Sequence, residues 1–226
     1  MPLSKRTKAN QEIASKYGGP QPMDVAVKAV KSFKGPSFDQ SVEVCVHLGI
    51  DPRQADQQLR GSIAMPKGVG KSARVICFCG EDKVEDAKAA GAVEAGGEEL
   101  VEKINDGWME FDVAVASPDM MKVVSRLGRM LGPKGLMPSP KAGTVTPDVV
   151  TAVREYAAGK LEYRNDDGGN IHCIIGKMSF TNDDLLENLR HFHDTIMKIR
   201  PASTKGTYLR KMVISGTMTP GIQIEV

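Results

Sequence analysis

Residues 41–48 read Ser-Val-Glu-Val-Cys-Val-His-Leu, and their alternation decides how the first part of the chain folds. Valine or leucine occupies every second position, and more polar residues or cysteine occupy the positions between them. Successive side chains of a β-strand point to opposite faces, so this pattern predicts a strand with one buried face and one more polar face. The polar face is where a ligand surface can lie.

The segments around this strand have their own patterns. An amphipathic helix is predicted by apolar residues at helical spacing, namely Met23, Ala26, Val27 and Val30. Lys34-Gly35-Pro36 ends that helix, and Asp51-Pro52-Arg53 follows the strand. The glycine- and proline-rich residues 65–71 are expected to be the first crossing between two domains.

From Arg74 onward, strand and helix patterns alternate. Residues 75–79 and 111–116 are predicted strands, and the predicted helices are 82–90, 98–105, a helix from Pro118 to Leu131, and 147–158. Strands that alternate with helices favour an α/β unit with a mainly parallel sheet. Gly159 is the expected second crossing.

The last third of the chain returns to a mixed pattern. Residues 171–175 are a predicted strand, and Thr181 with Asp184 resembles a capping box. A long helix follows, with Leu185, Leu189, Phe192, Ile196 and Ile199 facing the core and Pro201 ending it. Residues 208–214 and 222–226 are rich in strand-forming residues.

These patterns predict an α/β protein of two domains. The ends of the chain, residues 1–66 and 160–226, are each too small to form a core alone, so together they are expected to form one split α+β domain. Residues 67–159 are expected to form an inserted, three-layer, Rossmann-like α/β domain. Both crossings contain glycine, so Gly68, Gly70 and Gly159 are the predicted hinge.

Composition indicates a globular cytoplasmic protein with a polyanionic partner. No segment has the apolar length of a membrane span, and the N-terminus lacks the apolar core of a secretory signal. The net charge is only +2, but acidic residues are absent between Asp119 and Asp148 and between Asp194 and Glu225. Both stretches contain several Lys and Arg, which suit a polyanion. Ordinary solvated basic faces remain the alternative for each stretch.

The sequence contains no complete motif for a nucleotide-binding, metal-binding or catalytic site. Gly70-Lys71-Ser72 resembles the end of a phosphate-binding loop, but Met65 occupies the position of the required first glycine, and a strand follows in place of a helix. Cys77 and Cys79 share a strand face without a second ligand pair, and His191 and His193 point apart on a helix. We therefore expect no metal, no cofactor and no catalytic residues.

The four cysteines, Cys45, Cys77, Cys79 and Cys173, are unevenly spaced in a chain that is large enough to need no disulfides. They are interpreted as core thiols in a reducing compartment.

A series of short motifs runs in order along nearly the whole chain. They are Phe38-Asp-Gln-Ser-Val-Glu-Val44, Leu48-Gly-Ile-Asp-Pro-Arg53, Arg60-Gly61, Pro66-Lys-Gly-Val-Gly-Lys71, Leu131-Gly-Pro-Lys-Gly-Leu-Met-Pro138, Tyr163-Arg-Asn-Asp166, Lys205-Gly-Thr-Tyr208 and Ser215-Gly-Thr-Met218. Together they resemble the bacterial large-subunit ribosomal protein L1 family.

This resemblance implies a non-enzymatic protein of the mobile stalk of the large ribosomal subunit. The implied partners are the large-subunit (23S) rRNA, the tRNA that leaves the exit site, and the protein's own mRNA, whose translation it would repress. The implied RNA-binding residues of the split domain are Lys34, Phe38, Ser41, Glu43, Arg53, Asp166, Lys205, Ser215, Thr217 and Met218. Lys134 and Lys141 of the inserted domain are implied as secondary contacts.

The matched residues have suitable chemistry, because RNA is recognised through stacking, shape and 2′-hydroxyl groups. Without the resemblance, however, Phe38 and Met218 could equally be core residues, and Ser41 an ordinary strand residue. The chain departs from the family at Thr219, where a glycine usually follows Thr-Met, so the approach of the backbone to RNA is expected to differ there. A regulatory RNA-binding protein that never enters the ribosome would share all these features.

Overall fold

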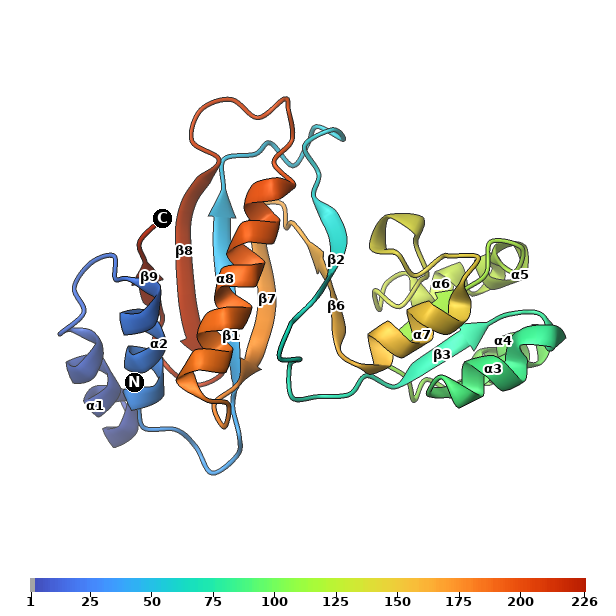
Figure 1. Cartoon of the computed structure of the whole chain (residues 1–226), viewed down its shortest axis with the longest axis horizontal. Coiled ribbons are helices and arrows are strands. Elements are labelled where there is room, and N and C mark those ends of the chain that lie inside the picture. Colours follow the sequence, from blue (N-terminus) through green and yellow to red (C-terminus); the bar gives the residue numbers. More distant parts are fainter. Residues whose placement is uncertain (1–2) are drawn as a thin grey trace. The chain divides into compact units, whose positions relative to one another are not determined.

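The computed structural model describes residues 3–226, and it shows a mixed α/β chain with three sheets (Figure 1). The chain divides into two compact units. Unit 1 combines the N-terminal residues up to Gly70 with the C-terminal residues from Tyr163, and unit 2 comprises Lys71–Glu162. The expectation of an α/β chain is therefore confirmed.

A four-stranded antiparallel sheet forms the centre of unit 1. Its order is β7-β1-β8-β9, and the strands are β7 (Asn170–Lys177), β1 (Ser41–Leu48), β8 (Leu209–Gly216) and β9 (Ile222–Ile224). The alternating strand of the sequence is β1, and it lies between two partners that come from the other end of the chain. Ser41 pairs with Lys177, and Val42 pairs with Gly216.

Two helices cover one face of this sheet. α2 (Met23–Ser32) contacts β8 and β9, and α8 (Asn182–Lys198) contacts β7 and α2. All the apolar residues of β1 are buried on the sheet: Val42, Val44, Val46 and Leu48. The Thr181 side chain accepts a hydrogen bond from the backbone N–H of Asp184 at the start of α8, which confirms the predicted cap.

Unit 1 also contains a further helix and part of a second sheet. α1 (Lys5–Ala14) precedes α2, and β2 (Arg60–Ala64) pairs with β6 (Lys160–Arg164). None of these three elements was predicted from the sequence. α1 has no apolar periodicity, and a two-stranded ribbon leaves too few buried positions to produce a clear alternation.

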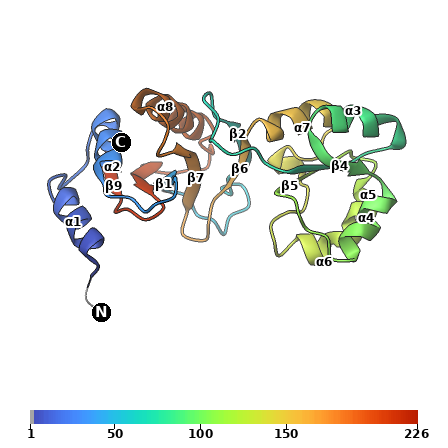
Figure 2. The same ribbon diagram turned by 90° about the horizontal axis from the view of Figure 1, so that it is seen from below.

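Unit 2 is a three-stranded parallel sheet in the order β4-β3-β5. The strands are β3 (Val75–Phe78), β4 (Ala92–Gly96) and β5 (Val113–Ala116). The 3-10 helix η1 (Glu81–Lys83) leads into α3 (Val84–Ala89), and Figure 2 shows α3 and α7 (Val149–Ala157) on one side of the sheet. On the other side lie α4 (Glu98–Asn105), α5 (Met121–Val124) and α6 (Gly128–Leu131). Parallel pairing is confirmed.

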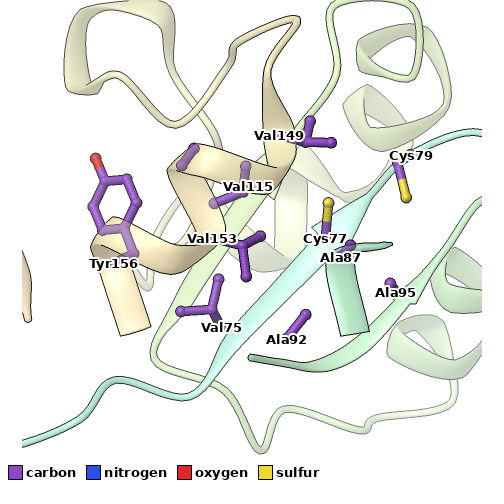
Figure 3. Close-up of a cluster of buried hydrophobic side chains, with 11 residues drawn as sticks. Val75, Cys77, Cys79, Ala87, Ala92, Ala95, Val115, Val149, Val153 and Tyr156 are labelled. Carbon is purple, nitrogen blue, oxygen red and sulfur yellow. The ribbon is translucent and has the colours of Figure 1, made fainter. Parts of the chain in front are cut away.

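Each face of this parallel sheet has its own core. Figure 3 shows the core beneath α3 and α7, where Cys77, Val153 and Tyr156 are buried. On the opposite face, Ile76 and Phe78 pack among residues from α4, α5 and α6. All four residues of β3 are buried, which is why its sequence is continuously apolar instead of alternating.

One predicted helix is wrong. Residues 118–131 form a turn, the short helix α5, a 3-10 turn at Ser125–Leu127 (η2) and the short helix α6, not one continuous helix. Val124, Leu127 and Leu131 are nevertheless all buried, so the apolar residues whose spacing predicted a helix do pack in the core. The tighter 3-10 turn changes the hydrogen bonding without removing these side chains from the sheet.

The first crossing out of unit 1 is fastened by a fully buried side chain. The Asn188 amide on α8 accepts from the Lys67 backbone N–H at 3.0 Å and donates to the Gly68 carbonyl at 2.9 Å. It also donates to the Ile175 carbonyl at 2.8 Å. Gly68 and Gly70 have φ angles of 66° and 72°, which favour glycine. Asn188 thus fixes the path of residues 67–68 on unit 1.

We expect Asn188→Ala to lower the free energy of unfolding by about 2–4 kcal/mol, because one buried and two partly buried backbone groups lose their partner and a cavity forms. Urea unfolding followed by circular dichroism would measure this. Asn182→Ala, an exposed change on the same helix, should stay within about 0.5 kcal/mol of the original protein. Equal stability of the two variants would contradict the role given to Asn188.

Candidate nucleic-acid interface

Ser41 and Thr217 meet at one end of the open sheet face. The Ser41 N–H donates to Thr217 Oγ1 at 3.2 Å, and the Thr217 N–H donates to the Ser41 carbonyl at 3.1 Å. Lys177 Nζ donates to Ser41 Oγ at 3.0 Å, which brings a cation to the same point. Three strands, β1, β7 and β8, therefore contribute to this end of the sheet.

Phe38 and Met218 lie exposed beside this pair. Their exposed fractions are 52% and 54%, so the alternative that they are core residues is excluded. The buried Gln40 side chain accepts from the Met218 N–H at 2.9 Å, which holds the Met218 backbone against the start of β1. Phe38, Pro36 and Met178 line an open hollow of about 410 Å³. We call Phe38, Ser41, Thr217 and Met218 the Phe38 cluster.

The middle of the open face is largely polar, although the exposed Ile174 of β7 also lies there, and it is not covered by α2 or α8. Glu43 lies exposed between Ile174 and Ser215 of the neighbouring strands. In the next rows, Cys45 pairs with His172, and His47 Nδ1 lies 2.8 Å from Asn170 Oδ1. Charged, imidazole and hydroxyl groups thus line the second face of β1, as its alternation predicted.

Asp166 lies at the opposite end of β1, where it organises a loop. Its Oδ1 accepts from the backbone N–H groups of Gly168 at 2.9 Å and Asn170 at 2.7 Å. Hydrogen bonds from the side chain and backbone of Asn170 hold the pKa of this exposed carboxyl below its usual value. The ionised form accepts these hydrogen bonds, and the His172 Nε2 lies 3.9 Å from Oδ2.

Lys205 and Arg53 belong to the loops at this same end. Lys205, Arg210 and Asp51 line an open hollow of about 500 Å³, and the Arg53 N–H donates to Asp51 Oδ1 at 3.1 Å. Lys205 and Arg53 are both exposed. A basic concave surface at this end suits a phosphate or sugar group more than an apolar ligand.

The implied RNA-binding residues of unit 1 therefore lie mainly in two groups, one at each end of β1. Eight residues of strand span about 23 Å from the first Cα atom to the last. A small metabolite cannot contact both groups at once, whereas a folded nucleic acid can. The polar rows around Glu43 and His47 connect the two groups across the open face.

Thr219, the residue that departs from the family pattern, closes the turn after β8. Its Oγ1 accepts from the Gly216 N–H at 2.8 Å, and its backbone N–H donates to the Gly216 carbonyl at 3.1 Å. No residue other than glycine in the described part of the chain has a positive φ, so Thr219 adopts an ordinary backbone conformation. A glycine at this position would leave the turn more flexible, whereas the Thr219 side chain stabilises it with a hydrogen bond.

The remaining predicted cations belong to neither group. Lys34 is exposed in the loop before Phe38. Lys134 and Lys141 are exposed in the glycine- and proline-rich loop of unit 2, where the Tyr156 hydroxyl donates to the Ala142 carbonyl at 2.6 Å. That hydrogen bond anchors the loop to α7.

Sequence reasoning missed Gln40 and Lys177, although both contact the Phe38 cluster. Lys177 ends β7 on the same face as His172, but nothing local indicates that β7 lies next to β1. Gln40 precedes the alternating strand directly, and a polar residue at a strand start carries no signal that it will be buried.

Within residues 3–226, no group of three or more His, Cys, Asp or Glu could hold a metal ion, and no helix is long and apolar enough to cross a membrane. Cys77, Cys79 and Cys173 are buried, while Cys45 is partly exposed on the open face, and all four are free thiols. Burial raises the pKa of Cys173 to about 12, so this thiol is unreactive at neutral pH.

Comparison with known proteins gives the family. Residues 29–220 match the sequence model of the ribosomal protein L1p/L10e family. The chain is also 48% identical, over 226 residues, to the large ribosomal subunit protein uL1 of Lactiplantibacillus plantarum, and the match covers 99% of both chains. The family resemblance of the motifs is therefore confirmed.

The motifs, the family match and the near full-length relative agree: the chain belongs to the ribosomal protein L1p/L10e family, whose members are ribosomal proteins and not enzymes.

Proposed function

We propose that this protein is a structural component of the large ribosomal subunit in the cytoplasm, and that it binds the large-subunit (23S) rRNA through unit 1. The observation that carries the proposal is the Phe38 cluster at the end of an uncovered polar sheet face. An exposed aromatic ring, an exposed methionine and two hydroxyl residues beside a lysine form a surface suited to RNA.

Each residue of the surface has a role that follows from its contacts. Phe38 and Met218 pack on a base or ribose, because both are exposed and apolar. Glu43 and Ser215 accept from or donate to base edges and 2′-hydroxyl groups. Lys34, Arg53 and Lys205 neutralise phosphates. Ser41, Thr217 and Asp166 mainly hold the surface in shape, because their polar atoms are engaged with the protein.

We further propose that the units are separate domains: a split α+β RNA-binding domain and an inserted, Rossmann-like α/β domain. The buried residues of unit 1 and the two clusters of unit 2 support this, because each unit has a core of its own. Gly68, Gly70 and Gly159, all with positive φ, are the proposed hinge. Gly70 is the preferred pivot of the first crossing, because Asn188 fixes Gly68. Lys134 and Lys141 supply secondary RNA contacts.

The finer functions follow from the family resemblance. The protein forms the mobile stalk, assists the release of deacylated tRNA from the exit site, and represses translation by binding its own mRNA. A regulatory protein that never enters the ribosome is the competing function. Fractionation of ribosomal subunits separates the two, because a stalk protein copurifies with the large subunit at stoichiometric amounts. A nuclease footprint on total rRNA then identifies the bound segment.

The affinity of this protein for rRNA should depend strongly on salt. Binding to the footprinted rRNA segment should weaken steeply as salt rises, because Lys and Arg release counterions from phosphates. Between about 50 and 200 mM salt, the affinity measured by filter binding should fall by roughly 10³-fold or more if six or more phosphates are contacted. A flat plot of log affinity against log salt would contradict a phosphate-binding surface.

Substitutions in the Phe38 cluster should distinguish a residue that contacts RNA from a residue that supports the surface. Phe38→Ala should weaken rRNA binding by about 1–3 kcal/mol through lost stacking, with unchanged thermal stability. Thr217→Ala should weaken binding on the same scale, because the turn loses its bond to Ser41, whereas Thr217→Ser retains the hydroxyl and should bind normally. Met197→Ala, an exposed apolar change on α8, is the control for Phe38. Unfolding of Phe38→Ala, or normal binding by it, would contradict the assignment.

Unit 1 should fold and bind rRNA without unit 2. Replacing residues 71–159 by a short Gly/Ser linker leaves β6 and every buried residue of the four-stranded sheet in place. The shortened protein should unfold cooperatively and keep most of its rRNA affinity. An affinity loss as large as that of Phe38→Ala combined with Thr217→Ala would instead place the principal site around Lys134 and Lys141.

A further inference from the structure

The N-terminal helix α1 contributes almost nothing to the core of unit 1. Its only buried residue is Asn10, and its inward-facing residues Arg6, Ile13 and Ala14 are half-buried. A ten-residue polar helix is only marginally stable by itself in water. Helices of this kind are normally held by an apolar face, and α1 lacks one. The structure must therefore hold it in another way.

One buried amide fastens α1 to the body of unit 1. Asn10 Nδ2 donates to the Lys34 carbonyl at 3.0 Å, and the Lys34 N–H donates to Asn10 Oδ1 at 2.8 Å. Asn10 is 1% exposed, so its amide is shielded from water on the side of α1, although Lys34 itself is exposed. Because both atoms of one side-chain amide bind one residue, the bond pair fixes the rotation of α1 about its axis as well as its position.

That fixed rotation directs two lysines to solvent. Lys5 and Lys8 lie roughly 140° and 160° around the helix from Asn10, which places them on the opposite face. Both are exposed and have no ion-pair partner in the part of the chain that the structure describes. The first turn contains no acidic residue, and the positive end of the helix dipole adds to their charge.

The fastening point lies next to the Phe38 cluster in the chain. Only Gly35, Pro36 and Ser37 separate Lys34 from Phe38, so their Cα atoms are at most about 14 Å apart. The helix rises about 7.5 Å from Asn10 to Lys5. Figures 1 and 2 both show α1 beside α2, whose C-terminal end leads into this loop. These lengths allow one folded RNA to reach both Phe38 and the start of α1.

We propose that α1 is an electrostatic arm of this RNA-binding surface, in which Lys5 and Lys8 contact phosphates of the RNA bound at the Phe38 cluster. Asn10 is a positioning residue that holds the arm in place. This inference rests on the proposed function. Lysine is a compact point charge without a planar hydrogen-bonding fork, so the arm adds affinity and orientation and does not read the RNA sequence.

The charge of the arm can be removed without touching its anchor. The double variant Lys5→Gln/Lys8→Gln should bind purified large-subunit rRNA more weakly at low salt and approach the original protein as salt rises. The slope of log affinity against log salt should fall in magnitude by about 1.5, as expected for two lost phosphate contacts. Circular dichroism and the melting temperature should be unchanged, because both side chains are exposed.

The anchor can be removed without changing the charge. Asn10→Ala should free α1, which hydrogen exchange of the α1 amides reports as lost protection. Binding to the rRNA should weaken although every lysine remains, because the arm must then be ordered on binding. The single variant Lys88→Gln is the control for charge alone, since this exposed lysine lies on α3 in unit 2.

The outcomes separate the two proposals. If the original protein binds the rRNA and Phe38→Ala weakens it, while Lys5→Gln, Lys8→Gln and their combination behave like Lys88→Gln, the arm is refuted and the proposed function stands. The arm is also refuted if Asn10→Ala frees α1 but leaves the affinity and salt slope unchanged. If the original protein does not bind the rRNA, the proposed function fails, and the arm fails with it.

Discussion

The pairing of β1 with β7 on one side and β8 on the other is the constraint on which the rest of unit 1 depends. Because side chains alternate along a strand, one face of β1 must join the core beneath α2 and α8, and the other must face away from it. The same eight residues therefore build both the core and the open polar surface. A shift of one residue in the pairing would place Glu43 in the core and Val44 on the surface.

This pairing also has a consequence for assembly. β1 lies near residue 45, whereas its partners lie near residues 174 and 213, and the whole of unit 2 is encoded between them. The sheet of unit 1 can close only after the C-terminal part of the chain exists. Long-range pairing of this kind forms slowly, because the chain loses the entropy of loop closure before the stabilising contacts form. The separate core of unit 2 makes the intervening segment compact, which shortens the effective loop.

The polar groups of the proposed RNA-binding surface also hold the structure together. Gln40, Ser41 and Thr217 use their hydrogen bonds to hold the backbone at the end of the sheet, and this leaves Phe38 and Met218 exposed in fixed positions. Asp166 does the same for the loop at the other end. An interface that is ordered before binding loses less conformational entropy when the ligand arrives. In the proposed interface, the residues that contact RNA and the residues that support them are therefore neighbours in one motif.

Sequence alone determined the elements whose signals are local. The alternation of residues 41–48, the helical spacing and cap of α8, and the continuous apolar run of β3 were readable because burial on one element imposes its own period. The family motifs were likewise readable as short runs. Only the tertiary structure decided that Phe38 and Met218 are exposed, that Gln40 is buried beneath them, and that Asn10 fastens a helix without an apolar face. It also divided residues 118–131 into short turns of helix. These features depend on contacts between residues far apart in the chain, and a local pattern contains no information about which distant segment will cover it.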